Sequence, residues 1–182
     1  MKKTLIVLLV LVFPVSLWAM DIPQGKYELT GTTSFDFATS SLDTGNGDVD
    51  TDTISLELDG QYYFQKNIAL GVSFTYNDTD VDGSALDSTF WMIGPQATYN
   101  ISIDPKLSFF VNGMIGYANY DIGNNDSDGF GFKVGGGVKY FFVNNVALVG
   151  QLKYTWMNLD PDFGPDWDYS ELSLGAGLAV VF

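Results

Sequence analysis

The sequence predicts an all-β protein: an eight-stranded antiparallel transmembrane β-barrel that follows a cleaved signal peptide. Three observations carry this prediction. Apolar and polar residues alternate in eight segments, the connections between the segments alternate between short and long, and aromatic residues gather at the segment ends. Period-two alternation indicates strands, and short turns at one end with long loops at the other are typical of barrels that cross a membrane.

The start of the chain predicts an export signal. Lys2 and Lys3 precede an apolar run over residues 4–18, and Ala19 supplies a small residue at the cleavage point. We place the cut after Ala19, so residues 1–19 are the signal peptide and residues 20–182 the barrel domain. A permanent anchor helix is the alternative, but the run is short of the ~20 residues that a spanning helix needs, and Pro14 interrupts it.

The alternation defines the eight strands in chain order. The segments are residues 27–37, 54–64, 68–76, 91–99, 107–117, 130–142, 146–156 and 171–182. The apolar sets of the first four are Tyr27, Leu29, Phe35 and Phe37; Ile54, Leu56, Leu58, Tyr62 and Phe64; Ile68, Leu70, Val72, Phe74 and Tyr76; Trp91, Ile93, Ala97 and Tyr99. Those of the last four are Leu107, Phe109, Val111, Ile115 and Tyr117; Phe130, Phe132, Val134, Val138, Tyr140 and Phe142; Val146, Leu148, Leu152, Tyr154 and Trp156; Leu172, Leu174, Ala176, Leu178, Val180 and Phe182.

A soluble β-sandwich would also alternate, so the distribution of charge decides between the two architectures. The polar face carries charges in mid-strand, whereas the other face is almost free of charge, as expected if it faces lipid. Short connections fall near residues 65–67, 102–106 and 143–145, and long polar ones at 39–50, 77–87, 121–129 and 160–168. Aromatic rings with one polar edge suit the two membrane interfaces. We therefore assign two groups of aromatic residues to the interfaces: Tyr27, Tyr62, Phe64, Tyr99, Tyr140, Phe142 and Phe182 at one end of the barrel, and Tyr76, Trp91, Tyr117 and Trp156 at the other.

The chain closes on an alternating motif, Leu174-x-Ala176-x-Leu178-x-Val180-x-Phe182. With the export signal and the eight segments, this motif resembles the small OmpA/OmpX-type barrels of Gram-negative outer membranes, over nearly the whole mature chain. The resemblance implies a location in the bacterial outer membrane and recognition by the barrel-assembly machinery, with Leu174, Leu178, Val180 and Phe182 as the assembly signal. We expect no periplasmic peptidoglycan-binding domain of the kind that OmpA carries.

The polar face would line a lumen that is just wide enough for side chains or one small ligand. We predict that its charges form a network of Lys–acid pairs made by Glu28, Glu57, Asp59, Lys133, Lys139, Lys153 and Glu171. Because a buried charge must be paired, we expect the three lysines to bridge to acids across the lumen and to plug it. A polar conduit lined by the same residues is the alternative.

The net charge of −14 comes mostly from acidic loops, which would repel anionic lipopolysaccharide unless divalent cations intervene. Asp78-x-Asp80-x-Asp82-Gly83 matches the opening of an EF-hand loop, and Asn124-x-Asp126-x-Asp128-Gly129 resembles it, but Thr89 stands where the bidentate Glu belongs. Turn chemistry explains these residues equally well. We therefore expect no ordered metal site or cofactor, only weak collective Ca²⁺ or Mg²⁺ binding. With no basic patch, a nucleic-acid partner is excluded.

The composition argues against an enzyme, since the chain contains no His and no Cys. The leading hypothesis is a non-enzymatic barrel with a structural and surface role: envelope integrity, adhesion to a host or cell surface, or cation-dependent contact with lipopolysaccharide and outer-membrane lipid. The alternative hypothesis is a narrow pore, or a conduit for small solutes or small hydrophobic molecules.

Overall fold

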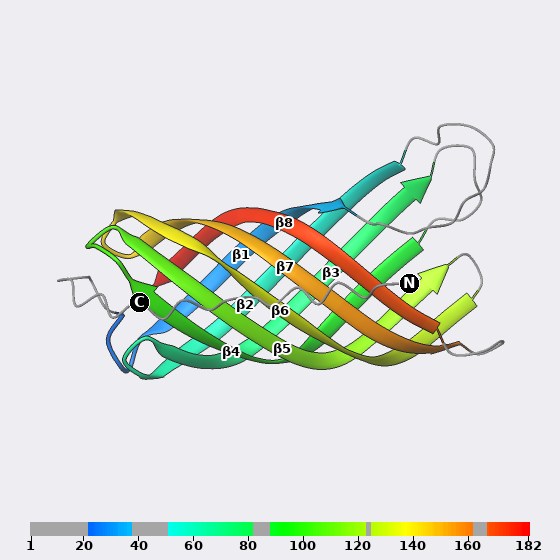
Figure 1. The fold of residues 1–182 in the computed structure, drawn as a ribbon, viewed down its shortest axis with the longest axis horizontal. Helices are drawn as coiled ribbons and strands as arrows, with labels where there is room; N and C mark the ends of the chain where they lie inside the picture. Colours follow the sequence, from blue (N-terminus) through cyan, green and yellow to red (C-terminus); the bar gives the residue numbers. More distant parts are fainter. Residues whose placement is uncertain (1–21, 38–50, 82–87, 123–124, 162–166) are drawn as a thin grey trace, which may run out of the picture.

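The computed structural model describes residues 22–37, 51–81, 88–122, 125–161 and 167–182, and it shows a closed barrel (Figure 1). The predicted signal peptide and its cleavage point lie outside the described residues. The strands are β1 (Tyr27–Phe37), β2 (Thr51–Gln65), β3 (Ile68–Val81), β4 (Ser88–Ser102), β5 (Leu107–Ile122), β6 (Asn125–Val143), β7 (Val146–Pro161) and β8 (Trp167–Val181). The predicted eight-stranded fold is confirmed. No helix in the described part of the chain is long and apolar enough to cross a membrane.

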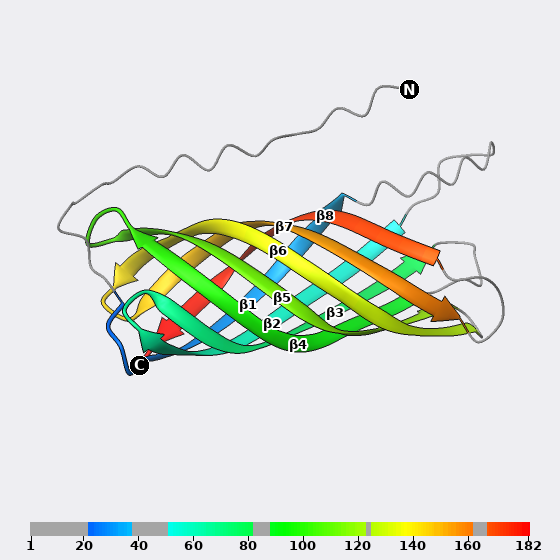
Figure 2. The ribbon, with the colours of Figure 1, turned by 60° about the horizontal axis from the view of Figure 1, so that its bottom comes forward.

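Every strand pairs antiparallel with its neighbours in sequence, and β1 pairs with β8 to close the sheet (Figure 2). At this seam the backbones of Tyr27 and Phe182 donate to each other's carbonyls, both at 2.9 Å. The two rings stack on the outside with their centroids 6.2 Å apart. Closure gives every strand a neighbour on both sides, as a sheet surrounded by hydrocarbon requires.

Tight turns join the strands at the end that holds the carboxyl terminus (Figure 1). At the β2–β3 turn, Asn67 adopts a positive φ of 63°, a left-handed conformation that asparagine tolerates well. Its side-chain oxygen accepts a hydrogen bond of 2.9 Å from the backbone of Ile22, which ties the approach to β1 onto this turn. At the β4–β5 turn, Asp104 accepts hydrogen bonds from the backbone of Lys106 and Leu107. These turns fall where the sequence predicts short connections.

At the opposite end the strands run further than the apolar alternation indicates. The expected long connections at 77–87 and 121–129 are partly strand, because β3 continues to Val81 and only residues 123–124 separate β5 from β6. Polar side chains support this extension: Asn119 donates to Asp126 at 2.5 Å and to Asp128 at 3.0 Å across the β5–β6 ladder. Backbone hydrogen bonds between strands do not need an apolar face. A strand can therefore continue beyond the part of it in which apolar and polar residues alternate.

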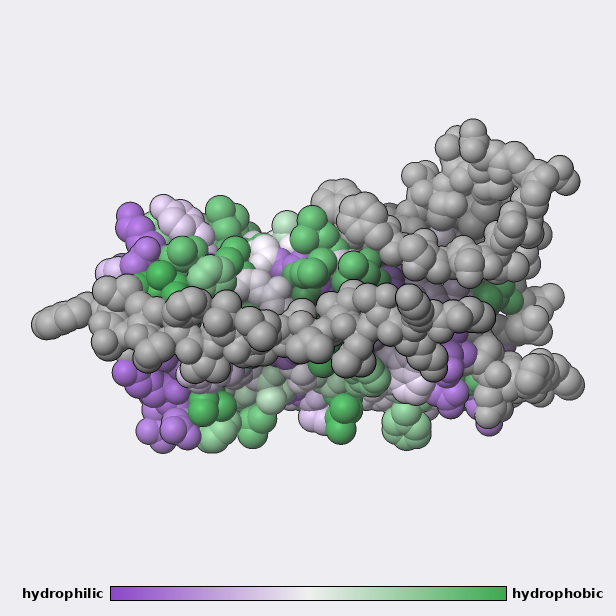
Figure 3. Space-filling view, in the orientation of Figure 1, coloured by the Kyte–Doolittle hydropathy of each residue, from purple (hydrophilic) through white to green (hydrophobic). Residues whose placement is uncertain are grey.

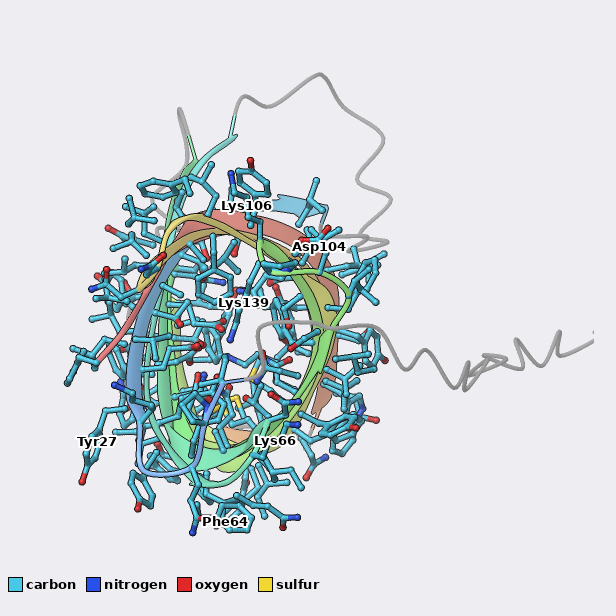
Figure 4. All side chains as sticks on the ribbon, turned by 90° about the vertical axis from the view of Figure 1, so that its left-hand side faces the viewer. Tyr27, Phe64, Lys66, Asp104, Lys106 and Lys139 are labelled. Carbon is cyan, nitrogen blue, oxygen red and sulfur yellow. The ribbon has the colours of Figure 1, made fainter. Side chains whose placement is uncertain are left out.

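The two faces of the sheet have opposite character. Apolar side chains cover much of the visible outer wall, whereas hydrophilic residues gather at the turn end (Figure 3). Large outward residues such as Leu58, Val111 and Leu178 are about half exposed. Viewed from the turn end, Tyr27 and Phe64 point away from the barrel while Lys139 points into it (Figure 4).

The inward face contains two apolar clusters and a set of buried polar groups. One cluster lies toward the tight turns and includes Tyr63, Phe110 and Phe141. The other lies toward the far end and is built around Phe90, Met92, Met114, Met157 and Leu159. Buried polar and charged side chains occupy the inward positions on the same strands, and they form the site described next.

Candidate functional site: the charged lumen

Glu28 on β1 and Lys139 on β6 meet across the lumen. The ammonium nitrogen of Lys139 lies 2.6 Å from Oε1 of Glu28, and both side chains are almost fully buried. Glu28 also accepts hydrogen bonds from Gln61 at 2.5 Å and from the Tyr63 hydroxyl at 2.9 Å. The Lys139 ammonium lies 5.0 Å from the centroid of the Phe110 ring, so a cation–π contact adds to the pairing.

Glu57 on β2 joins two lysines at one oxygen. Its Oε2 lies 2.7 Å from Lys133 on β6 and 2.8 Å from Lys153 on β7. Hydroxyl groups take up further hydrogens of both ammonium groups: Lys133 donates to Ser73 and Thr75, both at 3.0 Å, and Lys153 donates to Ser34 at 2.9 Å. A buried ion pair is tolerated when its remaining donors are also satisfied, and the three contacts of Lys133 meet that condition.

The bridges connect strands that are not neighbours in the sheet. They join β1 to β6, β2 to β6 and β2 to β7, so each one crosses the interior. Gln151 on β7 adds a further cross-lumen contact by donating to Thr32 on β1 at 3.0 Å. The serine and threonine partners were missing from the sequence hypothesis, although their inward parity was a signal that could have revealed them.

Two predicted members of the network have other partners. Within the described residues no lysine forms a salt bridge with Asp59; its carboxylate instead accepts hydrogen bonds from Ser73 and Gln96. Glu171 accepts a hydrogen bond of 2.7 Å from the hydroxyl of Tyr169. The structure thus brings the three lysines onto Glu28 and Glu57, and it links Asp59 to Lys133 through Ser73, to which both are bonded.

The weak metal candidate, Asp78, Asp80 and Asp82, is not an EF-hand-like loop as far as the structure describes it. Asp78 and Asp80 belong to β3, and Asp82 lies outside the described residues. Asp78 accepts a hydrogen bond of 3.3 Å from Thr89, its neighbour on β4. The described residues contain no group of three or more His, Cys, Asp or Glu that could hold a metal ion.

The predicted assembly residues lie on the outer face of β8 or directly after it. Leu174, Leu178 and Phe182 are about half exposed, and Val180 is half-buried. They form one side of the β1–β8 seam, where Leu178 is paired with Gly31. Their role in recognition by the assembly machinery remains a prediction.

An apolar groove on the outer wall was not anticipated from the sequence. It has a volume of about 450 Å³ and crosses β4–β7, with a lining that includes Ile93, Pro95, Ile115, Phe130, Phe132 and Trp156. Beneath it the β4–β5 ladder is interrupted, since pairing stops at Ile93–Tyr117 and resumes at Gln96–Met114 without a change of register. Pro95 has no N–H to donate to a ladder, and a mid-strand proline was the signal that could have revealed this gap.

The comparisons with known proteins agree with this architecture. A family model described as "Outer membrane protein beta-barrel domain" matches residues 5–182. The chain belongs to this outer-membrane β-barrel family. No curated protein sequence matches the chain.

Among solved structures, Neisserial surface protein A superposes with a TM-score of 0.66 at 16% identity, over 87% of this chain and 98% of that one. The N-terminal barrel domain of Pseudomonas aeruginosa OprF gives 0.56 at 16% identity, over 88% and 100%. OprG from the same organism gives 0.54 at 12% identity, over 88% and 97%. At these identities the likeness establishes the fold.

Membership of the family places the barrel in the bacterial outer membrane, as the sequence predicts. The apolar outer wall therefore faces lipid, and the two sets of aromatic side chains lie toward its ends. Trp91 and Tyr117 are in contact at one end, with ring centroids 5.5 Å apart, as are Tyr27 and Tyr62 at the other, 4.9 Å apart.

Proposed function

We propose that this member of the family is a non-enzymatic barrel with a plugged lumen, which supports envelope integrity and makes contacts at the cell surface. The observation that carries the plug is the cross-lumen network of Glu28, Glu57 and the three lysines. The polar cavity beside this network has a volume of only about 10 Å³, roughly the room that one water molecule needs.

The energetics of the bridges support a permanent plug. A conducting path would require the ammonium groups to leave their carboxylates. Removing one partner of a buried ion pair costs about 3–5 kcal/mol because the other charge is left uncompensated. Glu57 holds two lysines at once, so opening the lumen at this level breaks two contacts.

The reconstituted barrel is expected to show no steady single-channel conductance in planar bilayers. The physical reason is that, in the proposed plug, the ion pairs of Glu57 with Lys133 and Lys153 occupy the lumen. A trimeric general porin inserted into the same lipid provides the positive control for insertion and recording. A steady conductance that changes in Lys139→Ala would overturn the plug.

The surface part of the proposal rests on acidic side chains at the end opposite the tight turns. Asp126, Asp128, Asp160 and Asp168 are exposed there, and Asn158 donates to Asp168 at 3.0 Å. Carboxylates that face anionic lipopolysaccharide are compatible with it when divalent cations lie between them. This arrangement supports cation-dependent association with lipopolysaccharide, or adhesion through the same surface.

The lipid-facing groove favours a second candidate function, the lateral passage of small hydrophobic molecules. The groove meets the wall at the interrupted β4–β5 pairing, and a second hollow of about 350 Å³ extends it past Pro95 toward Gly113 and Val134. A small apolar solute could reach the wall there from the membrane.

A deletion strain separates the two candidates. We expect loss of detergent resistance with unchanged uptake of small apolar solutes, because the proposed role is in the envelope. The deletion strain is complemented with wild type or with Gly113→Val, so that the two complemented strains can be compared. A Cβ at position 113 meets only the Lys133 carbonyl, at 3.9 Å, and extends into the hollow. Reduced uptake in the deletion strain that wild type restores and Gly113→Val does not would favour the conduit.

A further inference from the structure

The segment that precedes β1 bends across the tight-turn end of the barrel (Figure 4). We call residues 22–26 the strap. Its first residue, Ile22, is only 5% exposed and belongs to the same apolar cluster as Tyr63 and Phe141, whereas residues 23–26 are exposed. Strand β1 begins at Tyr27, so the pairing of the sheet does not impose the burial of Ile22. The strap therefore inserts one apolar side chain into the lumen from its open end.

Hydrogen bonds at both ends of the strap hold it in place. The backbone N–H of Ile22 donates to the side-chain oxygen of Asn67 at 2.9 Å, and the Ile22 carbonyl accepts from the Asn67 N–H at 3.1 Å. At the other end, Gly25 donates to the carbonyl of Tyr63 and the Tyr63 N–H donates to the carbonyl of Lys26, both at 2.8 Å. Tyr63 and Asn67 lie at the end of β2 and in the turn that follows it. The strap is thus fixed to a single hairpin.

Tyr63 connects the strap to the charged network. Its side chain is completely buried in the cluster that contains Ile22, and its hydroxyl donates to Glu28 at 2.9 Å. Glu28, which binds Lys139, is paired with Gln61, and Gln61 lies further from the turn along β2 than Tyr63 does. From the tight-turn end inward, the order is therefore Ile22, the Tyr63 ring and the first ion pair.

We propose that the strap is a latch that closes the periplasmic mouth of the barrel, with Ile22 as its stopper. The short turns of outer-membrane barrels face the periplasm, so the strap covers the mouth on that side. A segment held by a few hydrogen bonds and one apolar side chain opens locally at a smaller cost than the strands of a closed sheet. Opening admits water to the apolar cluster while the strands stay paired. This closure is separate from the charged plug of the proposed function, and its test does not depend on conductance.

Single-cysteine labelling measures the closure, because the chain contains no Cys. Ala69→Cys places a thiol at a completely buried position in the Ile22 cluster, close to Asn67 in sequence. A water-soluble methanethiosulfonate reagent is added to the refolded barrel in detergent, and mass spectrometry gives the rate of modification. We expect Ile22→Ala to raise this rate about tenfold or more, because the rate follows the population in which the mouth is open.

Two further cysteines locate the effect at this mouth. Ala118→Cys is equally buried, but it lies in the cluster toward the far end, so its slow rate should not change with Ile22→Ala. Asn144→Cys is exposed at the β6–β7 turn and should react fast in both backgrounds. Equal rates at Ala69→Cys with and without Ile22→Ala, whether slow or fast, would overturn the latch.

A pair of variants at Asn67 tests the latch without altering an apolar side chain. Asn67→Gly preserves the positive φ, which glycine adopts readily, but removes the oxygen that holds the Ile22 backbone. It should also raise the rate at Ala69→Cys. Asn67→Asp keeps that oxygen and is the matched control, with a rate close to that of the unaltered strap. If Ile22→Ala does not fold, this pair decides, and equal rates for Asn67→Gly and Asn67→Asp would then refute the proposal.

Discussion

Lys139→Met is expected to lower the free energy of unfolding of the barrel by about 3–5 kcal/mol, the usual cost of removing one partner of a buried ion pair. Glu28 would keep its hydrogen bonds from Gln61 and Tyr63 but lose the only ammonium that the structure places on it within the described residues. The carboxylate has no route to water because it is completely buried. Urea titrations of the refolded barrel in detergent or vesicles measure the change.

Two comparisons make this result specific to the buried charge. The double variant Lys139→Met with Glu28→Gln should recover most of the loss, because the amide carries no charge and still accepts hydrogen bonds. Lys106→Met alters an exposed lysine at the β4–β5 turn and should change stability by less than about 0.5 kcal/mol. If Lys139→Met cost no more than Lys106→Met, the cross-lumen bridge would have no role in stability.

Gly177→Ala is expected to prevent normal closure of the barrel, with a loss of about 3 kcal/mol or more as the backbone is forced apart. A Cβ at this inward position would lie 2.0 Å from the carbonyl oxygen of Gly31 and 2.7 Å from the Cα of Thr32. Both atoms belong to the backbone of β1, so no side-chain rotation can relieve the collision. The seam between β1 and β8 would have to open.

The matched control for this variant lies on the same seam. Gly31 is partly exposed, and a Cβ there would meet only Leu58 Cδ2 at 3.6 Å, an ordinary contact. Gly31→Ala should therefore fold in normal yield, whereas Gly177→Ala should give a reduced folded fraction by the heat-dependent mobility shift on gels. Equal folded fractions for the two variants would show that the seam tolerates the added atom.

Side-chain parity was readable from the sequence because successive side chains of a regular strand point to opposite faces. Tyr140 and Phe142 are apolar, so Lys139 and Phe141 had to face the other way. Among the residues that the structure describes, the same parity identified the buried charged side chains of the lumen. It did not identify partners, because parity says nothing about the height of a residue on one strand relative to a strand across the barrel.

Strand ends were less predictable than strand faces. The alternation of apolar residues reports where lipid touches the wall, and Asp126 and Asp128 lie beyond that region. They are nevertheless strand residues, held in β6 by pairing with Asp121 and Asn119 of β5. A sequence criterion based on hydrophobicity therefore ends the strand too early.

The amino-acid sequence by itself determined the class of fold, the number of strands, the lipid-facing side and the set of inward charges, because all of these follow from period-two patterning within single segments. The tertiary structure alone decided that Lys133 and Lys153 share Glu57, that Ser73 and Gln96 donate to Asp59, and that Pro95 interrupts a ladder beneath a groove. These features depend on the stagger between strands when the sheet closes, which local patterning cannot specify.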